Sequence, residues 1–421
     1  MLDIKFIRDN KELVAANSKN RLSAVDIERL LSIDEARRAL QSQIQELRTK
    51  RNQTSKSKPS PEEISEMKSV GESIAKMETE ELELTKVFND LLLNVPNLTH
   101  PEVRVSENDT DNPVMESVGK IPHFKFEAKD HVELAEALDL VDFERGTKIA
   151  GSKFYYLKNE LVLLNRALVD YALSVAMKHG FKAVLTPDLA KTSLIEGMGY
   201  NPRGESSQVY RIEDSALSLI GTSEITLGGY HSDEILDLSK GPIKYVGLSN
   251  CFRTEAGSYS KFSKGLFRVH QFEKVEMFVF SRPELAEKLH SEMLKVEKEI
   301  FKGLGIPFRV VDHCTADLGA PSYRTYDLEA WLPGKPNGED KKGDWAEITS
   351  TSNCTDFQSR SLNIKFIDTD GQKKYVYTLN GTGVAVSRAL IAIMENYQTK
   401  NGEIVIPKVL RKYLPFKKIG S

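Results

Sequence analysis

Two stretches decide the fold of this chain: Cys251-Phe-Arg-Thr-Glu-Ala-Gly257, which continues to Phe267-Arg-Val-His-Gln-Phe-Glu-Lys-Val-Glu276, and Asn380-Gly-Thr-Gly-Val-Ala-Val-Ser-Arg388. The first predicts a strand, a polar loop and a second strand. The second predicts a glycine-rich turn that leads into a helix, with Arg388 in the first turn near the positive end of the helix dipole. Together they predict a polyphosphate-binding site that needs no P-loop.

The composition is that of an ordinary globular protein. The chain has 421 residues, of which 40% are hydrophobic and 28% are charged, enough for one large core and an accessory domain. Its net charge of −3 argues against a binder that coats nucleic acid regardless of sequence. The 3 cysteines have neither zinc-ligand nor disulfide spacing, so we expect a reducing compartment and no zinc.

The N-terminal residues resemble neither a signal peptide nor a transit peptide, and no long apolar run follows them. We therefore expect no membrane span, and a cytoplasmic protein rather than one of the mitochondrial matrix.

Heptad spacing marks two long helices near the N-terminus. Between them the chain breaks at residues 56–61, which is too short for anything but a return along the first helix. We expect an antiparallel two-helix coiled-coil arm about 45 Å long. A coiled coil used only for dimerisation is the alternative. The predicted seam consists of Leu30, Ile33, Arg37, Leu40, Ile44, Leu47 and Arg51, then Met67, Val70, Ile74, Met77, Glu81, Leu84, Phe88, Leu91 and Val95.

Glycine, proline and aspartate cluster from Pro96 to Gly119 and predict a linker. The expected domains are a helical arm over residues 1–100, a linker over 101–120 and a compact domain over 121–421. Strand-like runs in succession favour an antiparallel α+β domain over a doubly wound parallel sheet. They lie at residues 181–185, 218–221, 243–250, 267–280, 308–311, 323–331, 344–351 and 374–379, with helices near 161–178, 284–304 and 387–397.

Several side chains suit a nucleotide and a small zwitterion. Arg253 and Arg388 each offer a guanidinium fork to phosphate oxygens, although Arg253 could instead form only an ion pair with Glu255. Phe272 could form one wall of an adenine slot or be a core residue. Glu347 and Ser350 could hold Mg²⁺ against phosphates, although this spacing alone is a weak signal. The Gly-Thr-Gly-Val-Ala-Val run does not have the spacing of a Rossmann fingerprint.

Taken together, these segments resemble the class II aminoacyl-tRNA synthetases, and most closely the seryl-tRNA synthetase family, over nearly the whole chain. Gly180-Phe-Lys-Ala-Val-Leu-Thr-Pro187 is similar to motif 1, which lies at the dimer interface in that class. The two opening stretches are similar to motifs 2 and 3. Three features set the seryl family apart from its class: Thr222-Ser-Glu224, the run from Glu347 to Gln358, and the helical hairpin.

The resemblance implies a class II catalytic domain, an antiparallel sheet flanked by helices, in a homodimer. It implies that ATP and Mg²⁺ are used to activate L-serine as seryl-adenylate, and that the seryl group passes to the 3′ end of serine tRNA, with selenocysteine tRNA as a further candidate. The arm would bind the long variable region of the tRNA. Arg253 and Arg388 would be the catalytic residues.

The residue roles implied by the resemblance fall into four groups. ATP would contact Arg253, Glu255, Arg268, Phe272, Glu347, Ser350 and Arg388. Serine would contact Thr222, Glu224, Glu276, Asn380 and Thr382, and Mg²⁺ would be held by Glu347 and Ser350. The tRNA would contact Arg48, Lys50, Arg51, Lys56 and Lys58.

The chain departs from the family pattern in three places. Ser223 stands where alanine is commoner, Ser387 replaces a usual glycine, and the motif 2 loop reads Ser260-Lys-Phe-Ser-Lys264. The loop leaves open how the acceptor end of the tRNA is held. Two rival functions are a non-catalytic RNA-binding paralogue, which Glu347 and Arg388 argue against, and an enzyme that loads an amino acid onto a carrier protein, which the arm argues against.

Overall fold

The computed structural model describes residues 1–54, 60–200, 207–256, 262–338 and 342–420. The chain divides into two compact units, Met1–Leu98 and Thr99–Ser421. Among the described residues, no helix is long and apolar enough to cross a membrane.

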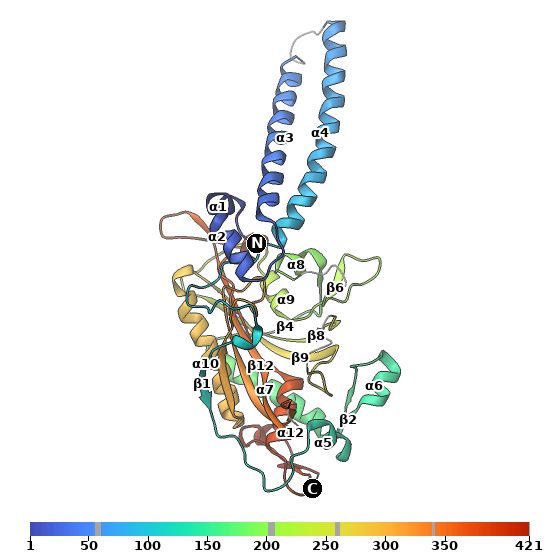
Figure 1. Cartoon of the computed structure of the whole chain (residues 1–421), viewed down its shortest axis with the longest axis vertical. Helices are drawn as coiled ribbons and strands as arrows, with labels where there is room; N and C mark the ends of the chain where they lie inside the picture. Colours follow the sequence, from blue (N-terminus) through green and yellow to red (C-terminus); the bar gives the residue numbers. More distant parts are fainter. Residues whose placement is uncertain (55–59, 201–206, 257–261, 339–341, 421) are drawn as a thin grey trace. The chain divides into compact units, whose positions relative to one another are not determined.

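The N-terminal unit contains the predicted pair of long helices, α3 (Ile27–Thr54) and α4 (Pro61–Leu93), which run side by side in Figure 1. The seam positions are buried or half-buried apart from Arg51. The helices are antiparallel, since Gln41 donates to Glu81 at 2.7 Å while Arg48, further along α3, pairs with Glu78 at 2.6 Å. Two short helices that we did not predict precede them, α1 (Ile4–Asp9) and α2 (Lys11–Asn20).

The C-terminal unit is built on an eight-stranded sheet in the order β1-β10-β11-β12-β15-β9-β8-β4. All neighbours are antiparallel except β4 and β8, which confirms the predicted antiparallel α+β architecture. The strands are β1 (Val114–Val118), β4 (Lys182–Leu185), β8 (Ile243–Phe252), β9 (Gln271–Ser281), β10 (Phe308–Asp312), β11 (Arg324–Pro336), β12 (Lys342–Asn353) and β15 (Tyr377–Ala385).

Three sequence expectations differ from this sheet. Strand β1 lies within the expected linker and pairs with β10, because its backbone completes the edge of the sheet. Residues 267–270, expected to begin a strand, precede β9 and form bends and irregular backbone instead. The glycine-rich segment from Asn380 is not a turn but the end of β15, because Gly381 and Gly383 pack closely against neighbouring groups that leave little room for a side chain.

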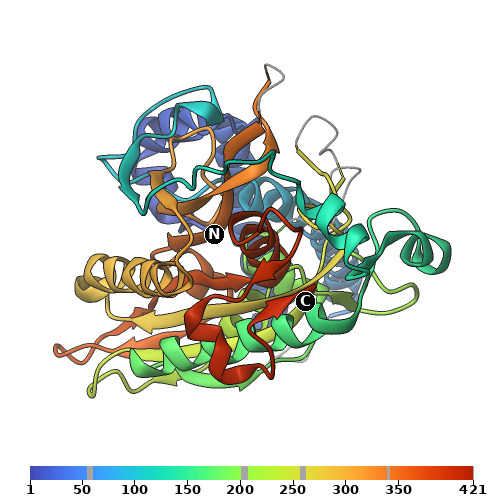
Figure 2. The same cartoon turned by 90° about the horizontal axis from the view of Figure 1, so that it is seen from below.

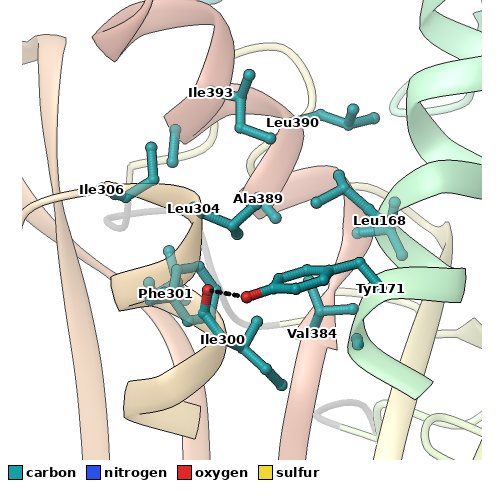
Figure 3. Packing of buried hydrophobic residues seen from close by; sticks show 14 of the residues in the cluster. Leu168, Tyr171, Ile300, Phe301, Leu304, Ile306, Val384, Ala389, Leu390 and Ile393 are labelled. Atoms are coloured by element: carbon teal, nitrogen blue, oxygen red, sulfur yellow. Dashed lines mark hydrogen bonds between the residues drawn. The ribbon is translucent and has the colours of Figure 1, made fainter. Parts of the chain in front are cut away.

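Helices α7 (Asn159–Lys178), α10 (Ala286–Leu304) and α12 (Val386–Asn396) cover one face of this sheet and enclose the main hydrophobic core (Figures 2 and 3). The 3₁₀ helix η3 (Lys408–Tyr413) packs against α7 and α10. Strand β9 alternates, so that Val275, Met277 and Val279 enter this core while Lys274 and Glu276 project from the opposite face. The alternation thus places polar side chains on the side away from the helices.

A second hydrophobic cluster covers part of that opposite face. It joins Phe278 and Phe280 of β9 to α8 (Thr192–Gly197), α9 (Glu224–Gly229) and the small sheet of β7 (Ile235–Leu236), β13 (Lys365–Ile367) and β14 (Lys373–Tyr375). The remaining elements are η1 (Asp109–Asp111), α5 (His131–Ala137), β2 (Val141–Asp142), α6 (Phe143–Ala150), β3 (Tyr156–Leu157), β5 (Leu189–Lys191), β6 (Leu217–Leu219), η2 (Pro283–Leu285), α11 (Phe357–Ser361), β16 (Ile404–Val405) and β17 (Lys418–Ile419).

The two tryptophans of the chain contact each other across β11 and β12. Trp331 and Trp345 are directly paired, with ring centroids 5.3 Å apart in an edge-to-face arrangement. Gly343 lies against Trp331, where a Cβ atom would come within 2.5 Å of the indole ring, and its φ of 105° also favours glycine.

Candidate active site

A cavity of about 410 Å³ opens on the face of the sheet away from α7, α10 and α12. It brings together nearly all the residues predicted to bind ATP or serine, from both opening stretches of sequence. Those that line it are Glu224, Arg253, Glu255, Arg268, Phe272, Glu276, Glu347, Ser350, Asn380, Thr382 and Arg388.

The two arginines of the opening stretches both reach this cavity. Arg388, in the first turn of α12, places Nη1 2.9 Å from Oε1 of Glu347 and 3.0 Å from its carbonyl oxygen. Arg253 follows β8, and its Nε donates to the carbonyl of Gly221 at 3.1 Å. The Arg253 guanidinium lies 5.3 Å from the ring centre of Phe272, which is half-buried and lines the cavity.

Arg268 and Glu255 form a pair 2.5 Å apart on opposite sides of the motif 2 loop. The Nε atom of Arg268 is buried and has no hydrogen-bond partner within the described part of the chain. Such an atom normally has a partner, so a bound anion that accepted from it would remove a cost of about 1–3 kcal/mol. Glu255 has a φ of 52°, which is uncommon for glutamate and fixes a sharp bend at the mouth of the loop.

Glu347 remains ionised in this setting. Desolvation opposes its charge, but the Arg388 guanidinium, together with His313 and Arg253, outweighs that effect and lowers the pKa of Glu347. The pKa of His313 is itself raised to about 10: its burial favours the neutral form, but Asp327, with Oδ2 2.9 Å from Nε2, outweighs that. His313 therefore lines the wall as an imidazolium paired with Asp327, and sequence analysis did not find it.

The register between β15 and β9 brings a second set of polar side chains together in the cavity. Thr382 of β15 lies directly opposite Glu276 of β9, and its Oγ1 is 3.3 Å from Oε2 of Glu276. Lys274, two residues earlier on the same face of β9, places its Nζ 2.5 Å from the same carboxylate oxygen. The alternation of β9 could have identified Lys274, since it shares a face with Glu276.

Glu224 lies at the inner end of the cavity and is only 5% exposed. Its carboxylate accepts from Tyr200 Oη at 2.6 Å, Gln358 Nε2 at 2.7 Å and Asn380 Nδ2 at 3.0 Å. Burial, followed by repulsion from Glu276, raises the pKa of Glu224. A cation that enters the cavity could therefore pair with the buried Glu224 carboxylate and stabilise its charged form.

Thr222 is the predicted site residue that does not line the cavity. It is 1% exposed, and its Oγ1 accepts from the backbone N–H of Glu224 at 3.2 Å, at the start of α9. In this structure the Thr222 hydroxyl therefore contacts the backbone of Glu224 and not the cavity.

Comparisons with known proteins agree over the full length. Residues 209–397 match the tRNA synthetase class II core domain (G, H, P, S and T), and residues 1–99 match the Seryl-tRNA synthetase N-terminal domain. A serine–tRNA ligase of Treponema denticola is 52% identical over 427 residues, covering 100% of each chain. The chain belongs to the seryl-tRNA synthetase family. This confirms the resemblance drawn from the motifs.

Solved structures of the seryl-tRNA synthetase family superpose closely. The enzyme of Pyrococcus horikoshii complexed with ATP has a TM-score of 0.86 at 39% identity, covering 100% of this chain and 99% of that one. The cytoplasmic enzyme of Naegleria fowleri in complex with AMP has a TM-score of 0.83 at 31% identity, covering 100% and 98%. A prolyl-tRNA synthetase of Giardia lamblia, at 16% identity and a TM-score of 0.55, covers 66% of this chain and 53% of that one and shares the fold.

In this seryl-tRNA synthetase family member, the basic residues predicted to contact tRNA are partly neutralised. Arg48 pairs with Glu78 at 2.6 Å and Lys50 with Glu66 at 2.7 Å, all on the surface of the arm. Arg51 is exposed. Lys56 and Lys58, and Ser260 and Lys261 of the motif 2 loop, lie outside the described residues.

Proposed function

We propose that this chain activates L-serine with ATP to form seryl-adenylate and transfers the seryl group to the 3′ end of serine tRNA. One observation carries the proposal: in a member of the seryl-tRNA synthetase family, a single cavity holds both arginines and the Glu224 and Glu276 carboxylates. The two substrates of an adenylation reaction can therefore meet in one place.

The arginine side of the cavity is proposed to bind ATP. Arg253 and Arg388 offer fork-shaped donors from different elements, so they can hold phosphate oxygens from two directions. The Nε of Arg268, which has no hydrogen-bond partner among the described residues, can donate to a third phosphate oxygen. The ring of Phe272 can stack on adenine, with Glu255 at the mouth of the loop.

The inner end is proposed to bind serine. The buried Glu224 carboxylate can pair with the α-ammonium group, and Asn380 and Thr222 hold this carboxylate and its backbone in place. Glu276 and Thr382, side by side across two strands, can hydrogen-bond the serine hydroxyl. A site built this way rejects alanine strongly, since its polar groups would be left unpaired, and excludes threonine by size.

The chemistry needs no covalent enzyme intermediate. The serine carboxylate oxygen attacks the α-phosphorus of ATP in line, and the bond to pyrophosphate breaks as the new phosphorus–oxygen bond forms. In the second step, the terminal ribose hydroxyl of tRNA attacks the acyl carbon and releases AMP. Arg253 and Arg388 hold the reactants and stabilise charge at phosphorus. Each of these two effects can lower the activation barrier by roughly several kcal/mol.

Glu347 and Ser350 are proposed to hold Mg²⁺ together with ATP. Both line the cavity, and the arginine-stabilised negative charge of Glu347 suits a hard cation that keeps several waters and needs few protein oxygens. The described residues contain no group of three or more histidine, cysteine, aspartate or glutamate side chains arranged for a metal, so phosphate oxygens would complete the shell. When bound, Mg²⁺ would neutralise phosphate charge.

A homodimer is proposed from exposed apolar side chains near the motif 1 segment. Leu185 of β4 is 80% exposed and Met177, at the end of α7, is 54% exposed. Covering such side chains in a second copy would remove them from water. Sedimentation equilibrium tests this, and a monomer at micromolar concentration would contradict it.

The decisive experiment charges purified serine tRNA with labelled serine, with alanine and threonine as controls. Serine-specific charging supports the proposal. Pyrophosphate exchange without charging would indicate a carrier-loading enzyme, and tRNA binding without either activity would indicate a non-catalytic paralogue. The same assay with selenocysteine tRNA tests the second candidate substrate.

The arm is proposed to bind the long variable region of serine tRNA. Deleting residues 30–95 should preserve serine-dependent pyrophosphate exchange, since the N-terminal unit has its own internal contacts and the cavity lies wholly within the C-terminal unit. Charging of tRNA should be lost. Unchanged charging would mean that the arm serves only assembly.

A further inference from the structure

A second depression, of about 820 Å³, lies among α7, α10 and η3. Its floor is Tyr171, Val175, Gly303 and Val409. We call it the lysine pocket, because six lysines line it: Lys178, Lys295, Lys298, Lys302, Lys408 and Lys412. None of its lining residues borders the candidate active site, which opens on the other face of the sheet.

The positive charge of this pocket is largely uncompensated. Glu299 is the acidic residue that lines it, and His179 contacts that carboxylate at 2.7 Å. Lys298 pairs with Glu116. The other five lysines are exposed, and none makes an ion pair with a described residue. Since the chain as a whole has 58 basic and 61 acidic residues, this concentration of one sign is local.

Helix dipoles explain only part of the cluster. Lys178 ends α7 and Lys302 lies in the last turn of α10, where a cation is favourable. Lys295 lies in the body of α10, one turn before Lys298, so these like charges repel. Lys408 and Lys412 add two more from η3, where no long helix favours them. The arrangement therefore costs stability when no anion is present.

The floor of the pocket is rigidly built. Tyr171 donates from Oη to the carbonyl of Ile300 at 3.3 Å, which ties α7 to α10 within the core (Figure 3). A Cβ atom at position 303 would lie 2.0 Å from that Oη atom, so only glycine lets the two helices approach this closely. The lysines thus project from elements whose spacing is fixed by core packing.

We propose that the lysine pocket binds a small anion that carries several phosphate groups. Its volume lies in the range of about 300–1,000 Å³ typical of small-molecule sites. Lysines act as point charges toward phosphate and do not impose the planar fork of arginine. Tyr171, the aromatic residue of the lining, is only 7% exposed, so it offers no open face on which a base could stack. Recognition would therefore depend on phosphate charge.

The test is calorimetric titration of the full chain with inorganic tripolyphosphate at low ionic strength. The pocket variant carries Lys295→Ala, Lys302→Ala and Lys408→Ala. A control variant of equal charge carries Lys120→Ala, Lys125→Ala and Lys373→Ala, which are exposed and do not line the pocket. Circular dichroism first establishes that both variants are folded.

We expect the wild-type chain and the control to bind one more equivalent of tripolyphosphate than the pocket variant, or to bind tripolyphosphate on the order of tenfold more tightly. Added salt should remove this difference in binding. Equal binding by all three chains overturns the proposal. Lysine-dependent binding of ATP and tripolyphosphate with similar affinity supports recognition by phosphate charge alone, and lysine-dependent binding of tripolyphosphate without ATP supports an inorganic anion. If only serine tRNA binds more weakly to the pocket variant, the surface contacts RNA and the proposal is wrong.

Discussion

Replacing Tyr200 with phenylalanine tests whether the hydrogen bonds around Glu224 set the affinity for serine. The hydroxyl of Tyr200 lies 2.6 Å from Oε2 of Glu224, and the substitution removes only this oxygen. A hydrogen bond to a charged group contributes about 1.5–3 kcal/mol, so the KM for serine should rise between about tenfold and a hundredfold. The KM for ATP should stay unchanged.

The effect should depend on pH in a definite direction. Burial raises the pKa of Glu224, and the Tyr200 hydroxyl partly opposes this rise by stabilising the carboxylate. Without the hydroxyl the pKa rises further, so less of the ionised form that pairs with an ammonium group is present as the pH falls. The ratio of the variant KM to the wild-type KM should therefore be larger at mildly acidic pH than at mildly alkaline pH.

The assay is pyrophosphate exchange at saturating ATP and varied serine concentration. Tyr245→Phe is the matched control, since its hydroxyl contacts His231 Nε2 at 3.0 Å and does not line the cavity. If Tyr200→Phe and Tyr245→Phe give the same KM for serine as the wild-type chain, the role proposed for the Glu224 network is wrong.

Three further predictions concern the cavity and the core. Arg388→Lys keeps the charge but loses the fork, so the KM for ATP in pyrophosphate exchange should rise about tenfold or more; an unchanged KM would show that charge alone suffices. His290 has its pKa lowered to about 4 by burial, so wild-type stability should fall by up to about 3 kcal/mol as the pH drops from 6.5 toward 4, whereas urea unfolding of His290→Gln should lack most of this loss. Gly303→Ala should destabilise the C-terminal unit by about 1–3 kcal/mol in the same unfolding assay, because its methyl group would overlap Tyr171, and a wild-type midpoint would contradict the packing described.

Sequence patterns predicted the features that depend on periodicity. The heptad seam of α3 and α4 is repetitive, so each turn supports the same prediction, and only Arg51 lies outside the interface. The strands of the sheet core were also found. Strand β1 was missed because its side chains are mostly exposed, and its apolar residues, Val114, Met115 and Val118, do not alternate with polar ones.

The site was predicted where motifs concentrate functional groups, and missed where distant segments supply single residues. Tyr200 and His313 reach the cavity from loops that carry no recognisable spacing. Their roles depend on Glu224 and Asp327, which only the folded chain brings near them. The glycines of the segment from Asn380 were read as a turn, because sequence alone does not distinguish a glycine needed for bending from one needed for close packing.

The contact between Trp331 and Trp345 has a practical consequence for spectroscopy. Both tryptophans of the chain belong to the C-terminal unit, and they share one environment between β11 and β12. Intrinsic tryptophan emission therefore reports on a single locus and is blind to melting of the N-terminal helices, which must be followed by far-ultraviolet circular dichroism. Transitions that differ between the two signals would reveal that the two units unfold separately.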